Sequence, residues 1–573
     1  MNPWEKSNIR QDKAMKKKGW FLLYFLAMMA FSPACNKGHA VADLALLGGS
    51  VWSGDGGRPW AEAVAVRGEK IIAVGATSEV RKLVGRETQV IDLGGGLVVP
   101  GFIDSHTHFL DGGFALLSIR LREAKSRDDF VARIRDKAAG MAKGEWILNG
   151  DWDQQQFDPP ELPGREWIDA VTPDNPVCVN RHDGHMVLAN SLALTLAGIT
   201  ARTPSPAGGE ILKDPRTGEP TGILKDAAME LVTRHIPAPN FDAKLKAAEA
   251  ALGLAARNGV TSTHDMAYGT GNLSVYRELV DSGKLTCRIF LYVPIVEVEA
   301  FSRLSLKTPF GNDLLKIGGL KAFVDGSLGS STALFFEPYA DDPRSSGLFA
   351  SDMFPEGIME QRIRAADIAG LQVAVHAIGD KANAVLLDIF EKVIAQNGPR
   401  DRRWRIEHAQ HLRPADMERM ARLGIIASVQ PYHAIDDGRW AERKIGAERC
   451  RTTYAFRSLL DKGVRIAAGS DWTVAPLDPL AGIYAAVTRR TTDGKHPEGW
   501  YPEQKISLEE AMRAYTTEGA YAEFAERSKG AIKEGFLADL VILDRDIFKI
   551  PAQDIAAARV VRTIVAGRTV FPD

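Results

Sequence analysis

Val98-Val-Pro-Gly-Phe-Ile-Asp-Ser-His-Thr-His108 is an apolar run that ends in two histidines separated by one residue. In a β-strand, residues two apart point to the same side, so His106 and His108 can present two imidazoles together. Neutral imidazoles are good ligands for zinc and related divalent metals. An isolated pair of histidines also fits an exposed strand end, so this motif does not define a metal site by itself.

Three other polar residues follow apolar runs further along the chain. His376 follows Val373-Ala-Val375, His408 closes Arg405-Ile-Glu407, and Asp471 comes after the run that ends at Ser470. Taken alone, each histidine is equally consistent with a hydrogen-bonded residue at a strand end, and Asp471 is consistent with the N-cap of the next helix. Catalytic groups of parallel barrels come from the C-terminal ends of different strands. Together with the histidine pair, these residues make four strand ends with polar side chains in one chain. This number favours a single site to which all of them contribute.

The middle of the chain alternates strand-like apolar runs with helical stretches, a pattern typical of a parallel sheet with crossover helices. Eight such runs predict an α/β fold, the (β/α)8 TIM barrel. They are residues 97–105, 260–265, 287–293, 318–324, 371–376, 404–408, 425–430 and 464–470. The gap between the first two runs is far too long for one βα unit. We therefore expect an inserted subdomain at about residues 120–240, within a barrel domain of residues 98–529.

Both ends of the chain read as short strands separated by turns. Residues 42–98 contain four apolar runs with glycine pairs such as Gly48-Gly49 between them, and residues 538–544 and 560–565 repeat this style. These pieces flank a middle of different character. They predict one small β-sandwich domain made of residues 41–97 and 530–573.

The first 40 residues read as a targeting segment. Four lysines between Lys13 and Lys18 precede the apolar run 20–31, which is too short for a spanning helix of about 20 residues. Ser32-Pro-Ala-Cys35 resembles a bacterial lipoprotein signal, although leucine is usual at the position of Ser32. We expect lipidation of Cys35 and an exported protein, periplasmic or membrane-anchored. Plain export, a retained anchor and a start at Met15 stay open.

The overall composition sets limits on partners. The 573 residues include 71 Lys plus Arg and 73 Asp plus Glu, a net charge of −2, which gives no electrostatic reason to expect nucleic acid. Four cysteines without a CxxC pair predict neither a disulfide framework nor a zinc ribbon. We expect a small-molecule substrate and no organic cofactor; the oligomeric state stays open.

Several segments together resemble the amidohydrolase superfamily. They are Val99 to His108, Leu320-Lys-Ala-Phe-Val-Asp-Gly-Ser-Leu-Gly329, Val375-His-Ala-Ile-Gly-Asp380, Arg405 to His408, and Gly469-Ser-Asp-Trp472. Within the superfamily the chain is most similar to the branch that includes N-substituted formamide deformylase. Gly150-Asp-Trp-Asp153, Arg181-His-Asp-Gly-His185 and Asn190-Ser-Leu-Ala-Leu194 support that placement.

The resemblance implies a site with two divalent metal ions, expected to be zinc. His106 and His108 would hold one ion, and His376 and His408 the second. Lys321 would be carboxylated and bridge both ions, because a carbamate offers oxygen ligands and an ammonium group offers none. The alternative is a plain Lys321 paired with Asp325, which would leave a single ion.

The resemblance also implies a role for Asp471 as a ligand of the first metal and as the catalytic base and acid. A metal-activated hydroxide would attack a polarised carbonyl of an amide, formamide or cyclic amide, and Asp471 would pass the proton to the leaving nitrogen. An ester, lactone, carbamate or phosphoester substrate stays open, as does a catalytically dead binding protein. Candidates for substrate contacts are Asp183, His185, His264, His433 and Trp472.

Overall fold

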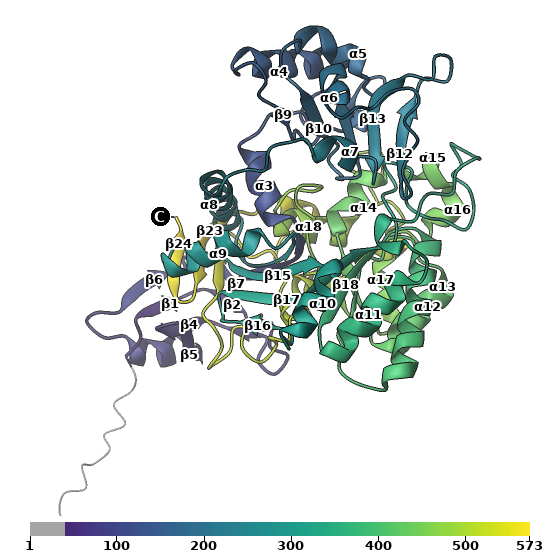
Figure 1. Cartoon of the computed structure of the whole chain (residues 1–573). Coiled ribbons are helices and arrows are strands. Elements are labelled where there is room, and N and C mark those ends of the chain that lie inside the picture. Colours follow the sequence, from purple (N-terminus) through teal and green to yellow (C-terminus); the bar gives the residue numbers. More distant parts are fainter. Residues whose placement is uncertain (1–40, 573) are drawn as a thin grey trace, which may run out of the picture.

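The computed structural model describes residues 41–572. Its centre is a nine-stranded sheet. Eight parallel strands follow the order β21, β20, β19, β18, β17, β15, β14, β8, with helices between successive strands (Figure 1), and the short β16 (Phe310–Gly311) pairs antiparallel with β17. The strands are β8 (Phe102–Thr107), β14 (Val260–Met266), β15 (Arg288–Pro294), β17 (Leu315–Phe323), β18 (Gln372–Ala377), β19 (Arg405–His408), β20 (Ile426–Val429) and β21 (Ile466–Ala468). All eight predicted strands are present, and the predicted α/β barrel is confirmed.

The two edges of this sheet meet through the residues that follow β8 and β21. The Asp471 N–H donates to the His106 carbonyl at 2.7 Å, and the His108 N–H donates to the Trp472 carbonyl at 2.8 Å. Thr107 and Trp472 form a parallel bridge between them. The sheet is therefore nearly closed into a barrel, and the closing seam places the histidine pair beside Asp471.

The first predicted strand, residues 97–105, is wrong in one respect. It is two strands, β7 (Leu97–Pro100) in a terminal sheet and β8 in the barrel, divided at Gly101. A Cβ at Gly101 would lie 2.2 Å from Thr261 Oγ1, so only glycine permits this close approach. The apolar pattern continues across the break because both strands are buried on both faces.

Strands from the two chain ends pack as a small β-sandwich. One sheet has the order β5, β4, β1, β6, and the other β24, β23, β22, β7, β2, β3. Their bounds are β1 (Leu44–Leu47), β2 (Ser50–Trp52), β3 (Trp60–Ala61), β4 (Ala63–Arg67), β5 (Lys70–Gly75), β6 (Gln89–Asp92), β22 (Leu540–Leu543), β23 (Val560–Val565) and β24 (Arg568–Phe571). Leu46, Val64, Ile542 and Ile564 share its core. Figure 1 shows the purple N-terminal strands beside the yellow C-terminal strands.

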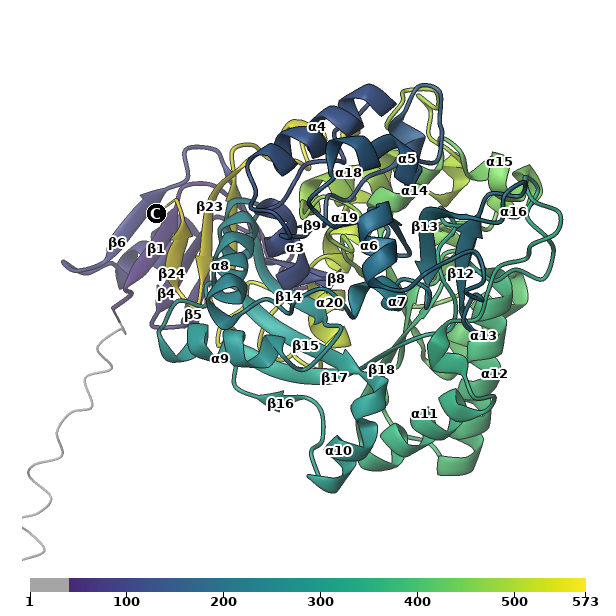
Figure 2. The same ribbon diagram turned by 45° about the horizontal axis from the view of Figure 1, so that its top comes forward.

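The long segment between β8 and β14 contains a second, separate sheet. Its five strands run in the order β12, β13, β11, β10, β9, with bounds β9 (Ile147–Leu148), β10 (Val177–Asn180), β11 (Met186–Ala189), β12 (Gly209–Lys213) and β13 (Pro220–Asp226). Helices α4 (Arg127–Ala139), α5 (Arg165–Ile168) and α6 (Ser191–Leu196) pack on it around apolar clusters of their own. We call this segment the insert. In Figures 1 and 2 it forms a lobe over the barrel.

The barrel helices bury small residues to approach each other closely. Helix α8 (Phe241–Arg257) begins where the Asn240 side chain accepts from the Ala243 N–H, and it buries an alanine-rich face. On α3 (Phe109–Leu116), a Cβ at Gly113 would lie 2.0 Å from the Ala247 carbonyl oxygen. The other long barrel helices are α9 (Asn272–Asp281), α11 (Ile358–Ala369), α12 (Asp380–Asn397), α13 (Pro414–Leu423) and α18 (Pro479–Thr488). Within residues 41–572, no helix combines the length and apolar character that a membrane span requires.

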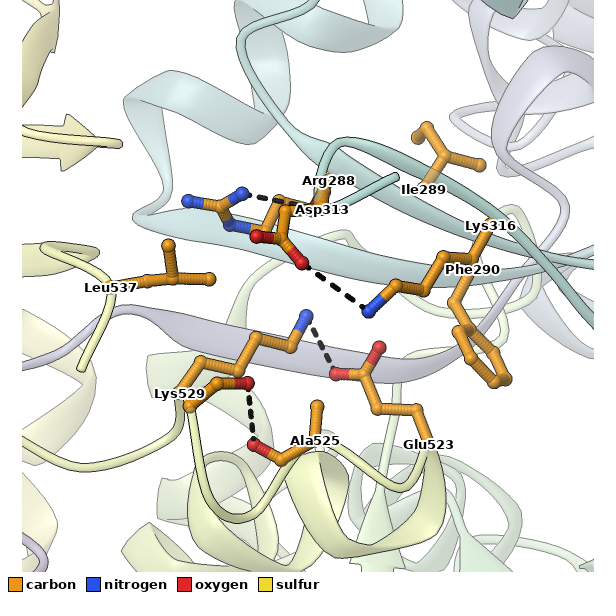
Figure 3. A pocket seen from close by; sticks show the side chains of 10 residues that line it. Arg288, Ile289, Phe290, Asp313, Lys316, Glu523, Ala525, Lys529 and Leu537 are labelled. Carbon is orange, nitrogen blue, oxygen red and sulfur yellow. Dashed lines mark hydrogen bonds and ion pairs between the residues drawn. The ribbon is translucent and has the colours of Figure 1, made fainter. Parts of the chain in front are cut away.

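The end of the barrel at which the strands begin is closed by the segment after α20 (Thr517–Ala522). Figure 3 shows Lys529 bonded to Glu523, at 2.6 Å between Nζ and Oε1, beside the first residues of β15 and β17. The cavity there has a volume of about 10 Å³, the space of a single water molecule. A cavity of this size is too small for an organic substrate. The predicted export signal and Cys35 lie outside the described residues.

Candidate metal centre

The six predicted metal-binding side chains converge at the carboxyl ends of the barrel strands. The ring centroids of His106 and His408 are 4.9 Å apart, and those of His376 and His408 are 4.5 Å apart. Asp471 Oδ1 lies 3.4 Å from the Nε2 atoms of both His106 and His108. Strands widely separated in sequence therefore deliver these groups to one place.

Three of these residues form a cluster that could hold a metal ion. His106, His408 and Asp471 are buried, and each offers a ligand atom within 4.8 Å of the others; residues 41–572 contain no other such group of three. Burial, with the nearby Lys321, lowers the pKa of His106 to about 4, and burial holds the pKa of His408 well below its usual value. Both imidazoles are therefore neutral near pH 7, as metal ligation requires. The buried His106 Nε2 has no hydrogen-bond partner in the described structure.

Lys321, in β17, is buried beside this cluster. Its Nζ has no hydrogen-bond partner among the described residues and lies 4.3 Å from the centre of the Phe323 ring. Burial lowers the pKa of Lys321 to about 8. Asp325 does not pair with it, because this carboxylate accepts backbone N–H groups of Leu334 and Gly379, each at 2.8 Å. The pairing that the sequence left open is therefore absent, and a buried amine stands unpaired beside the histidines.

The backbone is strained at two residues of the cluster. His408 has a φ of 74° and Asp471 a φ of 56°, in the left-handed region that residues with a side chain rarely adopt. Such conformations cost about 1–3 kcal/mol each and persist where the surrounding structure imposes them, often at functional sites. The strain falls on residues whose side chains must point into the barrel mouth.

A buried ion pair that we did not predict lies beneath His106. Glu407 Oε2 is 2.5 Å from His106 Nδ1, and Arg405 donates to both oxygens of Glu407 at 2.7 and 3.0 Å. This carboxylate fixes the ring orientation and leaves Nε2 of His106 free to face the cluster. The sequence held a signal, since Arg405 and Glu407 are charged residues two apart in a buried strand that ends at His408.

His264, one of the predicted substrate contacts, lies deeper in the barrel interior. Its Nδ1 is 2.6 Å from Arg405 Nη1, and its Nε2 is 3.9 Å from Glu523 Oε1. Glu523 belongs to the closed end of the barrel in Figure 3. The structure therefore places His264 beneath the cluster, with Arg405 and Glu407 between it and His106.

The insert brings two predicted residues to the barrel mouth. The His185 ring centroid is 5.2 Å from that of His376, and His185 Nδ1 is 2.6 Å from Asp226 Oδ1. Asp183 Oδ2 accepts from Ser327 Oγ, in the loop after β17, at 2.5 Å. Asp183 thus holds the insert against the barrel, and His185 faces the predicted metal ligands.

The last two predicted contacts lie on barrel loops. His433, in α14 (Pro431–Asp437), is buried, and its Nε2 has no partner in the described structure. Trp472 packs its ring on α3, where a Cβ at Gly112 would lie 2.5 Å from it. Trp472 therefore helps to close the seam of the barrel.

A parallel barrel with buried histidines and an aspartate at its strand ends defines a class, the metal-dependent hydrolases with a TIM-barrel fold. The chain belongs to the amidohydrolase family, which its sequence matches over residues 89–571. It is 41% identical to the protein LONG AFTER FAR-RED 3 of Arabidopsis thaliana, over 96% of this chain and 94% of that protein. It is 28% identical to N-substituted formamide deformylase of Arthrobacter pascens, over 92% and 97%.

Among solved structures, the chain is similar to an uncharacterized metal-dependent hydrolase from Pyrococcus horikoshii OT3. The TM-score is 0.72 at 30% sequence identity, and the match covers 89% of this chain and 99% of that one. The predicted family, the barrel and a metal-dependent hydrolytic function are thereby confirmed at this level.

Proposed function

We propose that this protein hydrolyses a carbon–nitrogen bond, that of an amide, formamide or cyclic amide, in a small organic molecule. The observation that carries the proposal is the convergence of His106, His408 and Asp471 within 4.8 Å of one another, beside the unpaired Lys321. The relative named as a formamide deformylase supports this bond type.

The donor set fits divalent metal binding, and we propose two ions, expected to be zinc. His106 and His108 would hold one and His376 and His408 the other, with Lys321, carboxylated on its unpaired amine, between them. If Lys321 stays unmodified, we expect a single ion at His106, His408 and Asp471.

The chain's own groups would handle the proton. A bound divalent metal lowers the pKa of water from about 15.7 to near 7 and stabilises developing negative charge. Asp471 Oδ1 lies 3.4 Å from His106 Nε2 and faces the same space, so its carboxylate can take a proton from the attacking water. It then delivers that proton to the leaving nitrogen.

The experiment is a screen of the purified protein against matched amides, esters, lactones, carbamates and phosphoesters. We expect amide or formamide turnover that chelation abolishes and metal re-addition restores. Metal-dependent turnover of an ester or phosphoester alone would assign the same site to another bond. Absence of any metal-dependent turnover, with ligand binding retained, would favour the binding-protein alternative.

A further inference from the structure

Tyr268 lies beside the predicted metal ligand His108, at the end of the barrel where the strands stop. It follows the last residue of β14 by two positions. The Tyr268 and His108 rings are stacked, with their centroids 4.8 Å apart and their planes within 7° of parallel. Tyr268 is 62% exposed and belongs to no hydrophobic cluster of the barrel. Its contact with His108 is therefore not explained by burial in the core.

The other three predicted histidine ligands each have a hydrogen-bond partner on one ring nitrogen. Such a partner fixes the orientation of a ligand histidine. The partners are Glu407 for His106 at 2.5 Å, Gln430 for His408 at 2.8 Å, and the Gly326 carbonyl oxygen for His376 at 3.1 Å.

His108 has no partner of this kind. Its Nδ1 is buried and makes no hydrogen bond to the described residues. The nearest strand offers the carboxylate of Asp265, but this group already accepts from the Phe109 N–H at 2.9 Å and the Tyr276 hydroxyl at 2.7 Å. The orientation of the His108 ring must therefore come from other contacts.

Three groups contact the His108 ring. Its Nε2 lies 3.4 Å from Asp471 Oδ1, the edge of the His106 ring is near it at 5.7 Å between centroids, and Tyr268 covers one face. Asp471 and His106 are themselves predicted metal ligands. Of the three, Tyr268 alone could orient His108 without binding the metal.

Two further neighbours locate the Tyr268 ring. Its plane is within 9° of parallel to the ring of Phe323, at the end of β17, with 6.5 Å between the centroids. Its hydroxyl faces the insert, because a Cβ added at Gly184 would lie 3.7 Å from it. The loop after β14 thus places this ring where the barrel mouth meets the insert.

We propose that Tyr268 is a positioning residue of the metal centre, whose ring stacks on His108 and holds the imidazole in the orientation that binds metal. An aromatic pair of this kind changes an equilibrium by about two- to tenfold beyond the effect of burial. The role requires a flat ring and does not require the hydroxyl. The proposal rests on the proposed function, because that function assigns His108 to a metal ion.

The test measures zinc affinity of the metal-free proteins in competition with a chromophoric chelator. Tyr268→Phe keeps the flat ring, and Tyr268→Leu replaces it with an apolar group that cannot stack. We expect Tyr268→Phe to bind zinc within about twofold of the wild type, and Tyr268→Leu to bind it about three- to tenfold more weakly. The matched control is Phe310→Leu, since Phe310 is also exposed, at 53%, and pairs with the beginning of β17 at the other end of the barrel. Its zinc affinity should equal that of the wild type.

A second measurement separates positioning of the ligand from a general loss of stability. The visible spectrum of bound Co²⁺ reports the geometry of its ligands. We expect the cobalt spectrum of Tyr268→Leu to differ from that of the wild type and the spectrum of Tyr268→Phe to match it. A change in stability alone would leave the spectrum as it is.

Equal zinc affinity of Tyr268→Leu and the wild type, even with a raised KM, would overturn the positioning role. So would an unchanged cobalt spectrum in Tyr268→Leu, or an equal loss of affinity in Tyr268→Phe. The expected order of affinities without hydrolysis of any amide would overturn the proposed function alone. Metal-dependent amide hydrolysis with equal affinities would overturn the role of Tyr268 alone, and a wild type that binds no zinc would overturn both.

Discussion

Replacing Glu407 with Gln tests the ion pair beneath the metal centre. The side chains of Arg405 and Glu407 are fully buried, and the two Arg405 bonds to the carboxylate measure 2.7 and 3.0 Å. Removal of the negative charge leaves the guanidinium buried without its counter-charge, because no other carboxylate bonds to Arg405 in the described structure. Removing one partner of a buried pair costs about 3–5 kcal/mol. We expect the free energy of unfolding of the metal-free protein to fall by about this amount.

The same substitution should weaken metal binding. Glu407 Oε2 is 2.5 Å from His106 Nδ1, and loss of the group that orients a ligand histidine typically lowers metal affinity about 10–100-fold. Competition with a chromophoric chelator measures this affinity, and denaturant titration of the metal-free protein measures the stability separately.

A matched control is Glu391→Gln on α12. Glu391 also pairs with arginines, Arg419 and Arg422, but its side chain is 33% exposed, so we expect a loss below about 1 kcal/mol and unchanged metal affinity. Wild-type metal affinity in Glu407→Gln would refute the assigned role of this pair. Equal destabilisation by both substitutions would refute the argument from burial.

Four further predictions concern single side chains. Asp471→Asn should retain metal and lose most turnover, measured by metal analysis and kcat; unchanged kcat would remove Asp471 from the proton transfer. Lys321→Ala should lower metal content, with partial rescue by short carboxylic acids; full metal content would contradict the carbamate. Cys35→Ser should move the protein out of membrane fractions, and continued retention there would argue against lipidation. Burial works to raise the pKa of Glu523, but Lys529 and His264 lower it to about 2. Because this lies below the ordinary value near 4.5, Glu523 stabilises the fold above pH 4.5, and that contribution is lost as the pH falls toward 2. Glu523→Gln should therefore flatten the acid side of a stability–pH curve, and an unaltered curve would contradict the shift.

The barrel could be predicted because its signals are local. An apolar run of strand length that ends in a polar residue identifies both a buried parallel strand and its functional end, as at His376 and His408. Gly101 was not recognised as a break, because burial continues on both sides of it and Thr261, which forces the close approach, is distant in sequence. The sequence therefore predicted the strands better than the domain to which each belongs.

The network under the metal centre could not be assigned for a related reason. Arg405 and Glu407 point into the barrel interior, where they contact His264 and His106 of other strands. These contacts exist only once the barrel has closed, so the sequence of one strand does not show them. For the same reason His264 was expected at the barrel mouth. The sequence shows a polar residue in a buried strand, but the depth of His264 in the barrel depends on the stagger of the neighbouring strands.

The position of the insert explains how one barrel can separate chemistry from selectivity. The insert follows α3, in the connection after the first barrel strand, and such connections lie at the catalytic face. Asp183 fastens it to the loop after β17, and His185 is held over the barrel mouth beside His376. The barrel strands supply the proposed metal ligands, and we expect a change in any of them to weaken metal binding. If the proposed function holds, we expect the insert to contribute groups that contact the substrate without binding metal, so that substitutions there alter which molecule is accepted while the metal ligands stay intact.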